Sequence, residues 1–376
     1  MSATFGVGLV GLEAGRSWGA VAHLPALRAL AEHLRIVGVA NSSLASAQVA
    51  ADACGLPRAF ASVDEMVSCP EIDIVVVTVK VPHHAAIVHA ALDAGKHVYC
   101  EWPLGNGLAE ANAMAAHAVA TKSIGLNLVT VCGMQARVSP ALTYVRDLIS
   151  EGYIGELLST SVIGNANSAG PTVEQANAYT LDVTNGATMA TIPLGHTLAV
   201  MADIIGPLAE VSAHIDTRRR SVRVVETGVE LTRTAPDQVV LAGKLASGSA
   251  VSVHYRGGSH RGSGLLWAFN GTKGDIQVTA PFGHTQIADL VVRGATGSEM
   301  NLRELAVPES YGTSGKVSAH VQNVYLMYQR MLADLRHGTH TTPSFADAVR
   351  VHEVLAAIEL SAATGTRVKI NATSGG

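Results

Sequence analysis

The sequence of 376 residues has little of three things: aromatic residues, charge and cysteine. Aromatic residues make up 4% of the chain, although hydrophobic residues, mostly Ala, Val and Leu, reach 48%. Charged residues make up 15%, with a net charge of −4 and no block of Lys or Arg, which argues against direct binding of nucleic acid. No apolar run approaches the ~20 residues that a membrane span needs. We therefore expect a protein with a large core and no nucleic-acid or membrane partner.

The four cysteines are isolated, because none of them forms a CxxC pair: Cys54, Cys69, Cys100 and Cys132. We interpret them as reduced, buried thiols of a cytoplasmic protein. The 16 His residues are scattered without an HExxH motif, so no metal site is predicted. The N-terminal residues Met1-Ser2-Ala3-Thr4 carry no basic region, and we interpret the apolar stretch after them as a first strand, not a signal peptide.

The first ~130 residues alternate short β-branched runs with Ala-rich segments, a pattern typical of a parallel sheet covered by helices on both faces. The expected strands are Thr4–Val10, Leu34–Ala40, Arg58–Ala61, Asp73–Thr78, His97–Cys100 and Ser123–Leu128. The expected helices between them are Trp18–Leu30, Leu44–Cys54, His83–Ala94 and Leu108–Thr121. This order predicts a doubly wound Rossmann sheet, and therefore an α/β fold class.

The pattern then changes to longer alternating strands. Two hairpins are expected, the first formed by Gln238–Leu245 with Ala250–Tyr255 and the second by Leu266–Asn270 with Asp275–Val278. Helices are expected at Pro140–Glu151, Ala187–Ile205, Val317–His337 and Phe345–Thr364. We therefore predict a dinucleotide-binding domain at 1–128 and an α+β domain with a large, mostly antiparallel sheet at 129–376. Because the open face of such a sheet usually needs covering, a homodimer or homotetramer is expected.

A glycine-rich turn follows the first strand. Gly11, Gly15 and Gly19 have the spacing GxxxGxxxG, which alone indicates no more than a tight turn. At the first strand of a doubly wound sheet, such a turn lets the backbone approach a pyrophosphate at the start of the next helix. The predicted cofactor-binding residues of this turn are Gly11, Gly15, Arg16, Ser17 and Trp18.

Three other strand ends are expected at the same edge of the sheet. After the second strand, Asn41, Ser42 and Ser43 can bind the ribose of NAD or the 2′-phosphate of NADP, or can simply cap the next helix. The choice between NAD and NADP therefore stays open. The predicted cofactor contacts at the ends of the fourth and fifth strands are Val79, Lys80, His84, Glu101, Trp102 and Pro103.

Four segments together resemble the Gfo/Idh/MocA oxidoreductase family. They are Gly95-Lys96-His97-Val98-Tyr99-Cys100-Glu101 with Pro103-Leu104, Asp73-Ile74-Val75-Val76-Val77 with His84, Asn270-Gly271-Thr272-Lys273-Gly274, and Pro343-Ser344-Phe345-Ala346-Asp347. The resemblance spans nearly the whole chain. It implies an NAD(P)-dependent oxidoreductase that acts on a CH–OH group of a sugar, cyclitol or related polyol held between the two domains.

A second set of segments is similar to the branch that contains the fungal galactose-regulon repressor. It consists of Glu101-Trp102-Pro103, Gln135–Pro140, Glu151–Gly155, Asn185-Gly186 and Gly195-His196-Thr197. This similarity implies NAD(P) binding that serves sensing through a protein partner, and we add Arg137 of the second segment to the cofactor-binding residues.

The sequence departs from the enzyme family at two of three expected acid/base positions. The family carries Glu-Lys-Pro where this chain has Trp102, and an Asp four residues before the His where this chain has Ile192. A ketone–alcohol interconversion needs a group that carries the hydroxyl proton. Our candidates are His196 at the matching family position and Lys80 at the end of the fourth strand. The alternatives are a core histidine and a lysine that faces phosphate or solvent.

The predicted substrate contacts are Trp102, Asn165, Tyr179, Asp182 and His196. Trp102 suits stacking on the nicotinamide or on a sugar face, or it fills the cleft. Asn165, together with Asn167, ends a strand and suits sugar hydroxyls, although turn formation is the simpler interpretation. Three hypotheses remain: an oxidoreductase, a cofactor-bound sensor without turnover, and redox-neutral chemistry with tightly held NAD.

Overall fold

The computed structural model describes residues 4–123, 125–312 and 317–370, which form two compact units. The first unit consists of residues 1–134 and 320–350, and the second of residues 135–319 and 351–376. The domain boundary predicted from the sequence lies at 128/129 instead, which places residues 320–350 in the other part. They join the first unit because Tyr328 packs against Tyr99, with 5.1 Å between the ring centroids, and Pro343 O accepts a hydrogen bond from Cys132 N.

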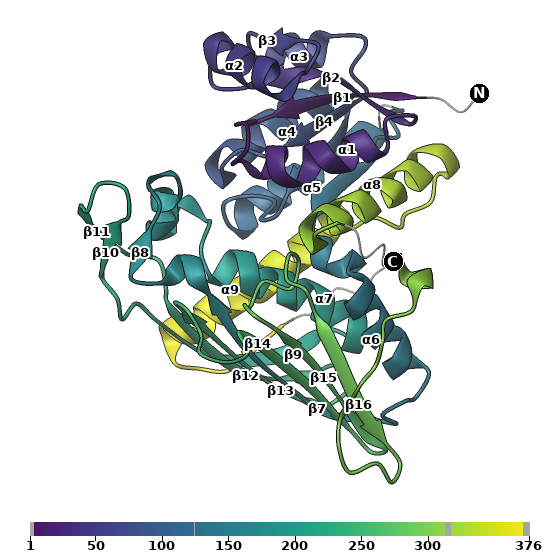
Figure 1. The fold of residues 1–376 in the computed structure, drawn as a ribbon, viewed down its shortest axis with the longest axis vertical. Helices are drawn as coiled ribbons and strands as arrows, with labels where there is room; N and C mark the ends of the chain where they lie inside the picture. The colour runs from purple at the N-terminus through teal and green to yellow at the C-terminus, as the bar shows by residue number, and fades with distance from the viewer. Residues whose placement is uncertain (1–3, 124, 313–316, 371–376) are drawn as a thin grey trace. The chain divides into compact units, whose positions relative to one another are not determined.

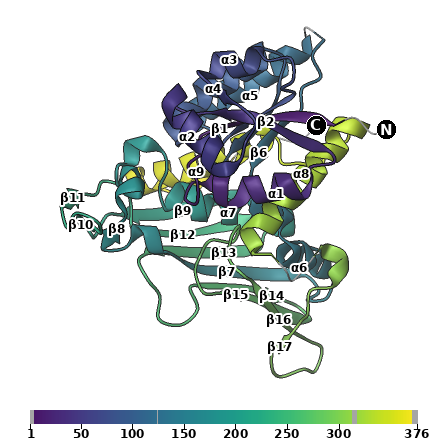
Figure 2. The ribbon, with the colours of Figure 1, turned by 45° about the horizontal axis from the view of Figure 1, so that its top comes forward.

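The first unit contains a parallel sheet of six strands in the order β3-β2-β1-β4-β5-β6, which is the Rossmann order. Its strands are β1 Phe5–Val10, β2 Leu34–Ala40, β3 Ala59–Phe60, β4 Ile74–Val77, β5 His97–Glu101 and β6 Thr130–Gly133. Its helices are α1 Leu24–Ala29, α2 Leu44–Cys54, α3 Val63–Ser68, α4 His84–Asp93, α5 Leu108–Ser123 and nearly all of α8, Ala319–His337. They lie on both faces of the sheet (Figures 1 and 2).

Local sequence explains most of these elements. β4 is the run Ile-Val-Val-Val, and all four residues are buried, as expected of a strand covered on both faces. Ser43 caps the start of α2 by accepting a hydrogen bond from Ser46 N, and Gly55 ends that helix with φ +60°. Ser62 caps α3 in the same way.

The prediction of the sixth strand at Ser123–Leu128 was wrong. Helix α5 extends to Ser123, and Leu126 N donates to Thr121 O to close the helix end; residue 124 lies outside the described residues. The strand that pairs with β5 is β6, in which Cys132 lies beside Cys100. The helix predicted at Trp18–Leu30 is also divided, into a π-helical turn at Gly19–His23 and then α1.

The second unit contains a sheet of nine strands in the order β17-β16-β15-β14-β7-β13-β12-β9-β18. Its neighbours are antiparallel, apart from the parallel pair β7–β13, so the prediction of a mostly antiparallel sheet is confirmed, as are both predicted hairpins. Its strands are β7 Leu157–Ala166, β9 Leu208–Asp216, β12 Gln238–Leu245, β13 Ala250–Gly257, β14 Leu265–Gly271, β15 Gly274–Ala280, β16 Val291–Thr296, β17 Arg303–Glu304 and β18 Val368–Lys369.

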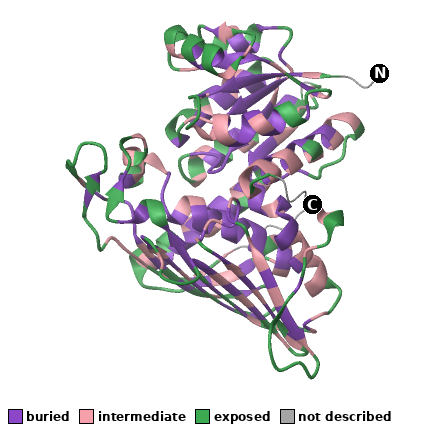
Figure 3. Ribbon diagram, viewed as in Figure 1, coloured by how far each residue is buried: buried purple, intermediate pink, exposed green. Residues whose placement is uncertain are grey.

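Helices and a smaller sheet complete the second unit. The helices are α6 Pro140–Ser150, α7 Gly195–Ile205 and the greater part of α9 Phe345–Thr364. The smaller sheet consists of β8 Thr172–Val173, β10 Ser221–Val224 and β11 Glu230–Thr232. The short helical turns along the chain are Val81–His83, Gln135–Val138, Asn167–Ala169, Gln175–Leu181, Val183–Asn185, Ala190–Leu194 and Glu309–Tyr311. Figure 3 shows buried residues along the strands of the large sheet and exposed residues in the loops beside β10 and β11.

Candidate functional site

The loop after β1 is built for close approach of two backbones. Gly11 has φ +94°, and a Cβ there would lie 2.6 Å from Val79 Cγ1 and 3.0 Å from Val79 N. A Cβ on Gly19 would lie 2.8 Å from Thr78 Oγ1. This hydroxyl donates a hydrogen bond to Gly11 O at 2.8 Å. A Cβ on Gly15, which has φ +72°, would meet no atom within 4 Å. The glycines therefore close the β1 loop against the β4 loop and leave its tip accessible, as a pyrophosphate site requires.

The side chains that follow Gly15 differ in exposure. Arg16 is more than half exposed and pairs with Glu13 at 3.1 Å, whereas Ser17 Oγ accepts a hydrogen bond from Glu13 N at 2.8 Å. Trp18 is half-buried, and its ring centroid lies 6.3 Å from that of His23. The guanidinium of Arg16 is thus the side chain of this turn best placed for a solvent-facing anion.

The residues after β2 tie two loops together. Asn41 Oδ1 accepts from Leu12 N at 2.8 Å, and Asn41 Nδ2 donates to Leu12 O at 2.9 Å and to Ser46 O at 3.1 Å. Ser43 caps α2, so the capping alternative holds for this residue. Ser42 is exposed, and it remains the residue of the three best suited to a ribose hydroxyl or a 2′-phosphate.

His84 joins the loops after β4 and β5. Its Nε2 lies 3.0 Å from Val79 O, and its Nδ1 lies 3.0 Å from Pro103 O and 3.2 Å from Leu104 O. Burial lowers the pKa of His84, and the facing carbonyls oppose that shift. With its nitrogens directed at backbone oxygens and 1% of the residue exposed, His84 holds the two loops, including the cis peptide Trp102–Pro103, at their relative positions.

A buried chain of hydrogen bonds ends at Glu101, the last residue of β5. Glu101 Oε1 lies 2.8 Å from His23 Nε2, and His23 Nδ1 lies 2.6 Å from Tyr328 OH. His23 and Tyr328 are fully buried, and the His23 ring meets Tyr99 edge-on at 5.1 Å. His23 and Tyr328 were not predicted from the sequence. The available signal was a single polar side chain within the apolar segment Ala20–Leu24.

Lys80, the candidate to replace the family Lys, and Trp102, which stands at the position of that Lys, differ in environment. Lys80 is exposed and precedes the turn Val81–His83, whereas Trp102 is 5% exposed. Strands β4 and β5 are neighbours in the sheet, as expected, with Val77 beside Cys100. Participation of Lys80 in proton transfer stays a prediction.

In the second unit, His196 is the second residue of α7 and is 3% exposed. Burial, and then the charge of nearby His284, lower the pKa of His196 to about 3. Burial lowers the pKa of His284 to about 4. Within the part of the chain that the structure describes, His196 Nδ1 has no hydrogen-bond partner. His196 is therefore neutral at pH 7, and its Nδ1 is a buried polar atom without a partner among the described residues.

A small cavity of about 50 Å³ lies beside His284. It is lined by Ser168, Ala169, Thr180, Ala187, Thr188, Met189, Ile192, Pro193, Arg233, Ala235, Pro236 and His284. This space is large enough for ordered waters. Ile192 contributes an apolar wall where the family has a carboxylate.

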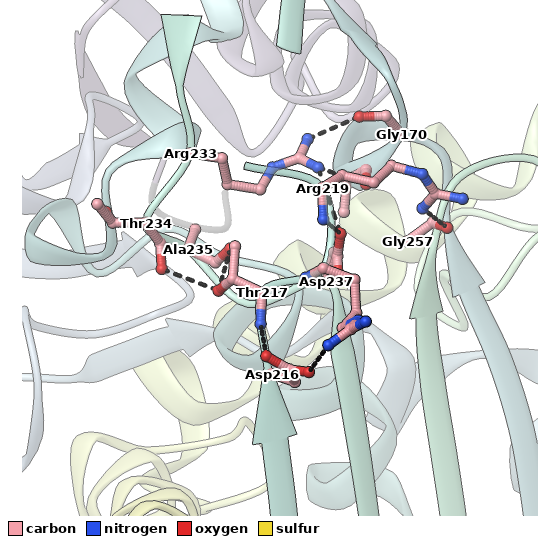
Figure 4. A network of polar contacts seen from close by, with 11 residues as sticks. Gly170, Asp216, Thr217, Arg219, Arg233, Thr234, Ala235, Asp237 and Gly257 are labelled. Atoms are coloured by element: carbon pink, nitrogen blue, oxygen red, sulfur yellow. Dashed lines mark hydrogen bonds and ion pairs between the residues drawn. The ribbon is translucent and has the colours of Figure 1, made fainter. Parts of the chain in front are cut away.

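Arg233, which lines this cavity, is held in place by backbone hydrogen bonds and an ion pair. Arg233 Nη2 donates to Gly170 O at 2.8 Å, and its guanidinium lies 3.8 Å from the carboxylate of Asp237 (Figure 4). Asp237 also accepts a hydrogen bond from Arg219 N at 2.7 Å, and Arg219 Nη1 donates to Gly257 O at 2.9 Å. Since Arg233 and Asp237 are 2% and 0% exposed, the pair forms a buried structural network that the sequence analysis did not find.

Two family models match the chain in succession. The model described as oxidoreductase family, NAD-binding Rossmann fold, matches residues 5–127, and the model of the Gal80p C-terminal domain matches residues 140–292. Dehydrogenase aclE from Aspergillus oryzae is 31% identical over 261 residues, which are 67% of this chain and 69% of that protein. The chain belongs to the Gfo/Idh/MocA oxidoreductase family.

Within this family the chain lies near the Gal80 branch. The galactose/lactose metabolism regulatory protein GAL80 from Kluyveromyces lactis is 30% identical over 308 residues, which are 76% of this chain and 66% of that protein. Among solved structures, a super-repressor mutant of Gal80p from Saccharomyces cerevisiae has a TM-score of 0.89 at 22% identity, covering 98% of both chains. Levoglucosan dehydrogenase in complex with NADH and levoglucosan has a TM-score of 0.81 at 22% identity, covering 98% of this chain and 100% of that one. Both likenesses show the shared fold.

The remaining predicted residues of this family member have structural contacts. Asn165 Nδ2 donates to Asn167 Oδ1 at 2.8 Å and to Gly258 O at 2.7 Å, and Asp182 caps the turn Val183–Asn185. The N–H and hydroxyl of Thr184 lower the pKa of Asp182. Such contacts are those of turn-forming side chains, so roles of Asn165 and Asp182 in substrate binding stay predictions.

Tyr179 and Arg137 belong to two short helical turns of the second unit. Burial raises the pKa of Tyr179, which therefore keeps its hydroxyl proton at neutral pH. Arg137 pairs with Asp203 of α7. Among the described residues, no group of three or more His, Cys, Asp or Glu is arranged to hold a metal ion. In the same ranges, no helix has the length and apolarity that crossing a membrane requires.

Proposed function

We propose that the chain is an NAD(P)-dependent oxidoreductase that acts on a CH–OH group of a sugar, cyclitol or related polyol. The β1 loop supports the cofactor part of this proposal, because Cβ atoms at Gly11 and Gly19 would collide with the β4 loop while Gly15 faces open space. Gly11, Gly15 and Arg16 would hold the pyrophosphate, and Ser42 would bind the adenosine ribose. When bound, the nicotinamide supplies the hydride chemistry.

The observation that carries the oxidoreductase proposal is the state of His196. A buried imidazole whose Nδ1 lacks a partner costs ~1–3 kcal/mol, and a polar ligand that meets this nitrogen recovers that energy. Being neutral at pH 7, His196 is able to accept a hydrogen bond from a substrate hydroxyl. The neighbouring structures support the substrate class, because levoglucosan is an anhydrosugar.

The test begins with calorimetric titration of cofactor-stripped protein with NAD, NADH, NADP and NADPH, followed by a polyol panel that starts with levoglucosan. We expect His196→Ala to lower turnover at least ~10²-fold and to leave the dissociation constant of the dinucleotide unchanged. His254→Gln, which changes a half-buried histidine on β13, is the matched control. Unchanged turnover in His196→Ala would remove His196 from the mechanism, and absence of any dinucleotide binding would overturn the proposed function.

A second candidate function is a dinucleotide-bound regulator that acts through a protein partner. Two residues favour it, because Trp102 and Ile192 stand where the family has a Lys and an Asp. The double variant Trp102→Lys with Ile192→Asp tests this alternative. A gain of turnover from a silent wild-type protein supports a regulator derived from an enzyme, whereas turnover of the wild-type protein excludes a purely regulatory role.

The open face of the nine-stranded sheet suits a second copy of the chain. Ile163 on β7 and Val240 on β12 are 42% and 41% exposed, although both belong to strands in the middle of the sheet. Ser161 and Ser252 lie near them and are joined by a hydrogen bond of 2.9 Å. We propose a homodimer or homotetramer through this face. Solution scattering should show it, and Ile163→Glu with Val240→Glu should give a folded monomer with a lower melting temperature.

A further inference from the structure

The first unit contains a pocket of about 600 Å³ between the end of α1 and one face of α8. Residues 28–33 line it from the α1 side, and side chains between Tyr325 and His337 line it from α8. Figures 1 and 2 both show these two helices next to each other. Small-molecule sites in proteins measure ~300–1,000 Å³, so the pocket has room for a small organic molecule.

This pocket lies away from the edge of the sheet at which the dinucleotide is proposed to bind. His33 is the last residue before β2, and its carbonyl accepts a hydrogen bond at 2.9 Å from the N–H of Phe5, the first residue of β1. The turn between α1 and β2 is therefore at the amino ends of the parallel strands. Ligands of doubly wound sheets bind at the carboxyl ends, so a molecule in this pocket would occupy a separate site.

Three buried polar atoms of the pocket lining have no hydrogen-bond partner among the described residues. They are Arg336 Nε, Arg336 Nη2 and His33 Nδ1. Such atoms are uncommon in folded proteins, and an ordered water or a bound ion often accounts for them. The Nε and Nη2 atoms form one edge of a guanidinium, and two parallel hydrogen bonds from such an edge hold a carboxylate or a phosphate. The two nitrogens of Arg336 that lack partners are therefore the pair that an oxyanion needs.

The rest of the lining suits an organic anion. Its arginines are Arg28 and Arg336, whereas Glu32 is the one acidic residue of the described lining. Because a guanidinium is always charged in proteins, arginine charge exceeds carboxylate charge here even when no histidine is counted. Leu30 and Leu332, which are 7% and 4% exposed, add an apolar part to the wall.

We propose that this pocket binds a small organic oxyanion, either a phosphate ester or a carboxylate, through the guanidinium of Arg336. Arg336 is half-buried and lines the pocket, so a small rotation of its side chain brings the Nε–Nη2 edge to the anion. The carbon body of the ligand then contacts Leu30 and Leu332. This site goes beyond the proposed oxidoreductase function and does not depend on it.

The test measures melting temperature and calorimetric binding of the full chain with glycerol 3-phosphate and with succinate, at an ionic strength held constant with chloride. We expect at least one of these probes to bind and to raise the melting temperature, and the tighter one identifies the oxyanion. Arg336→Gln should weaken that binding roughly 10- to 100-fold, because it removes two charge-assisted hydrogen bonds. Arg336→Lys keeps the charge without the parallel donors and should recover only a small part of the affinity.

The matched control is Arg330→Gln, a half-buried arginine of the same helix whose Nη1 donates to Thr341 O, and it should bind the probe as the wild-type protein does. The Arg336 variants should fold, because Nε and Nη2 give the fold no hydrogen bond. His33→Leu removes the third atom without a partner and should weaken binding by roughly 2- to 10-fold.

Arg16→Gln separates this pocket from the proposed pyrophosphate site in the β1 loop. Binding that is lost in Arg16→Gln and kept in Arg336→Gln would place the anion at the dinucleotide edge and overturn the inference. Absence of binding by both probes, or equal binding by Arg336→Gln and the wild-type protein, would overturn it as well. None of these results depends on whether a dinucleotide binds, so the inference and the proposed function fail independently.

Discussion

Buried histidines in two regions of the molecule differ in their hydrogen-bond partners. At the carboxyl edge of the parallel sheet, His23 and His84 have partners at both ring nitrogens. At the start of α7, His196 Nδ1 has none within the described chain. An unpaired buried polar atom costs ~1–3 kcal/mol, whereas a paired one contributes to stability. The two histidines of the first region are therefore paired parts of the scaffold, whereas His196 keeps one polar atom without a partner.

Removing the buried Arg233–Asp237 pair beside the second region should have the largest effect on stability. Asp237→Ala leaves the Arg233 guanidinium buried without its carboxylate and removes the acceptor of Arg219 N, so we expect a loss of about 3–5 kcal/mol in the free energy of unfolding. Urea unfolding measures it. Asp216→Ala is the control, because its partner Arg218 is largely exposed, and it should cost under about 1 kcal/mol. Equal losses would mean that the Arg233–Asp237 pair does not support this region.

The scaffold of the first region can be tested at its glycines. Gly11→Ala places a Cβ 2.6 Å from Val79 Cγ1 at a φ of +94°, so we expect it to cost about 2–3 kcal/mol and to weaken dinucleotide binding. Gly15→Ala has a φ of +72° but meets open space, and its cost should be about 1 kcal/mol. Thermal denaturation and calorimetric titration compare the two variants. A similar loss for both would show that backbone strain alone, and not contact with the β4 loop, makes Gly11 necessary.

The sequence predicted the architecture where local patterns decide it. Strand β4, helix α2 and both hairpins were predicted, because each depends on residues that are neighbours in the chain. The sixth strand was misplaced, because the apolar segment after α5 resembles a strand until the helix-closing bond of Leu126 is known. Residues 320–350 group with the first compact unit and not with the second, since pairing of Tyr328 with His23 joins positions 305 residues apart.

The site was predicted less completely than the fold. Gly11 and Glu101 lie in motifs of contiguous residues, which a single sequence reveals. His23, His284 and the Arg233–Asp237 pair belong to no such motif, and their roles arise only from side chains brought together by folding. Asn41 and His84 were predicted as ligand contacts from their residue types. In the folded chain, their side chains contact backbone groups of neighbouring loops instead.

Replacing His84 or His196 by leucine compares the two regions directly. His84→Leu removes the one N–H that neutral His84 donates to Val79 O or Pro103 O, so we expect a loss of about 1–3 kcal/mol. His196→Leu removes a buried nitrogen that has no partner and should leave stability unchanged or raise it by up to about 1 kcal/mol. Both are measured by urea unfolding at pH 7.5. A marked loss in His196→Leu would mean that its ring is a structural core residue, the alternative that the sequence left open.

A change in the pH dependence of stability separates the charge of His196 from its packing. The pKa of His196 is about 3 in the folded protein and near 6.5 in an unfolded chain. Between these values the unfolded chain binds the extra proton, so acidification from pH 6.5 lowers stability by up to about 1.4 kcal/mol per pH unit for this residue. His196→Leu should therefore lose less stability than the wild-type protein between pH 7.5 and pH 5.0, by about 2 kcal/mol. His284 and His352, whose pKa values are also lowered to about 4 by burial, titrate in both proteins, so their contributions cancel in the difference. Parallel pH profiles of the two proteins would show that His196 is hydrated and not buried in a neutral state, and the contrast between the two regions would then disappear.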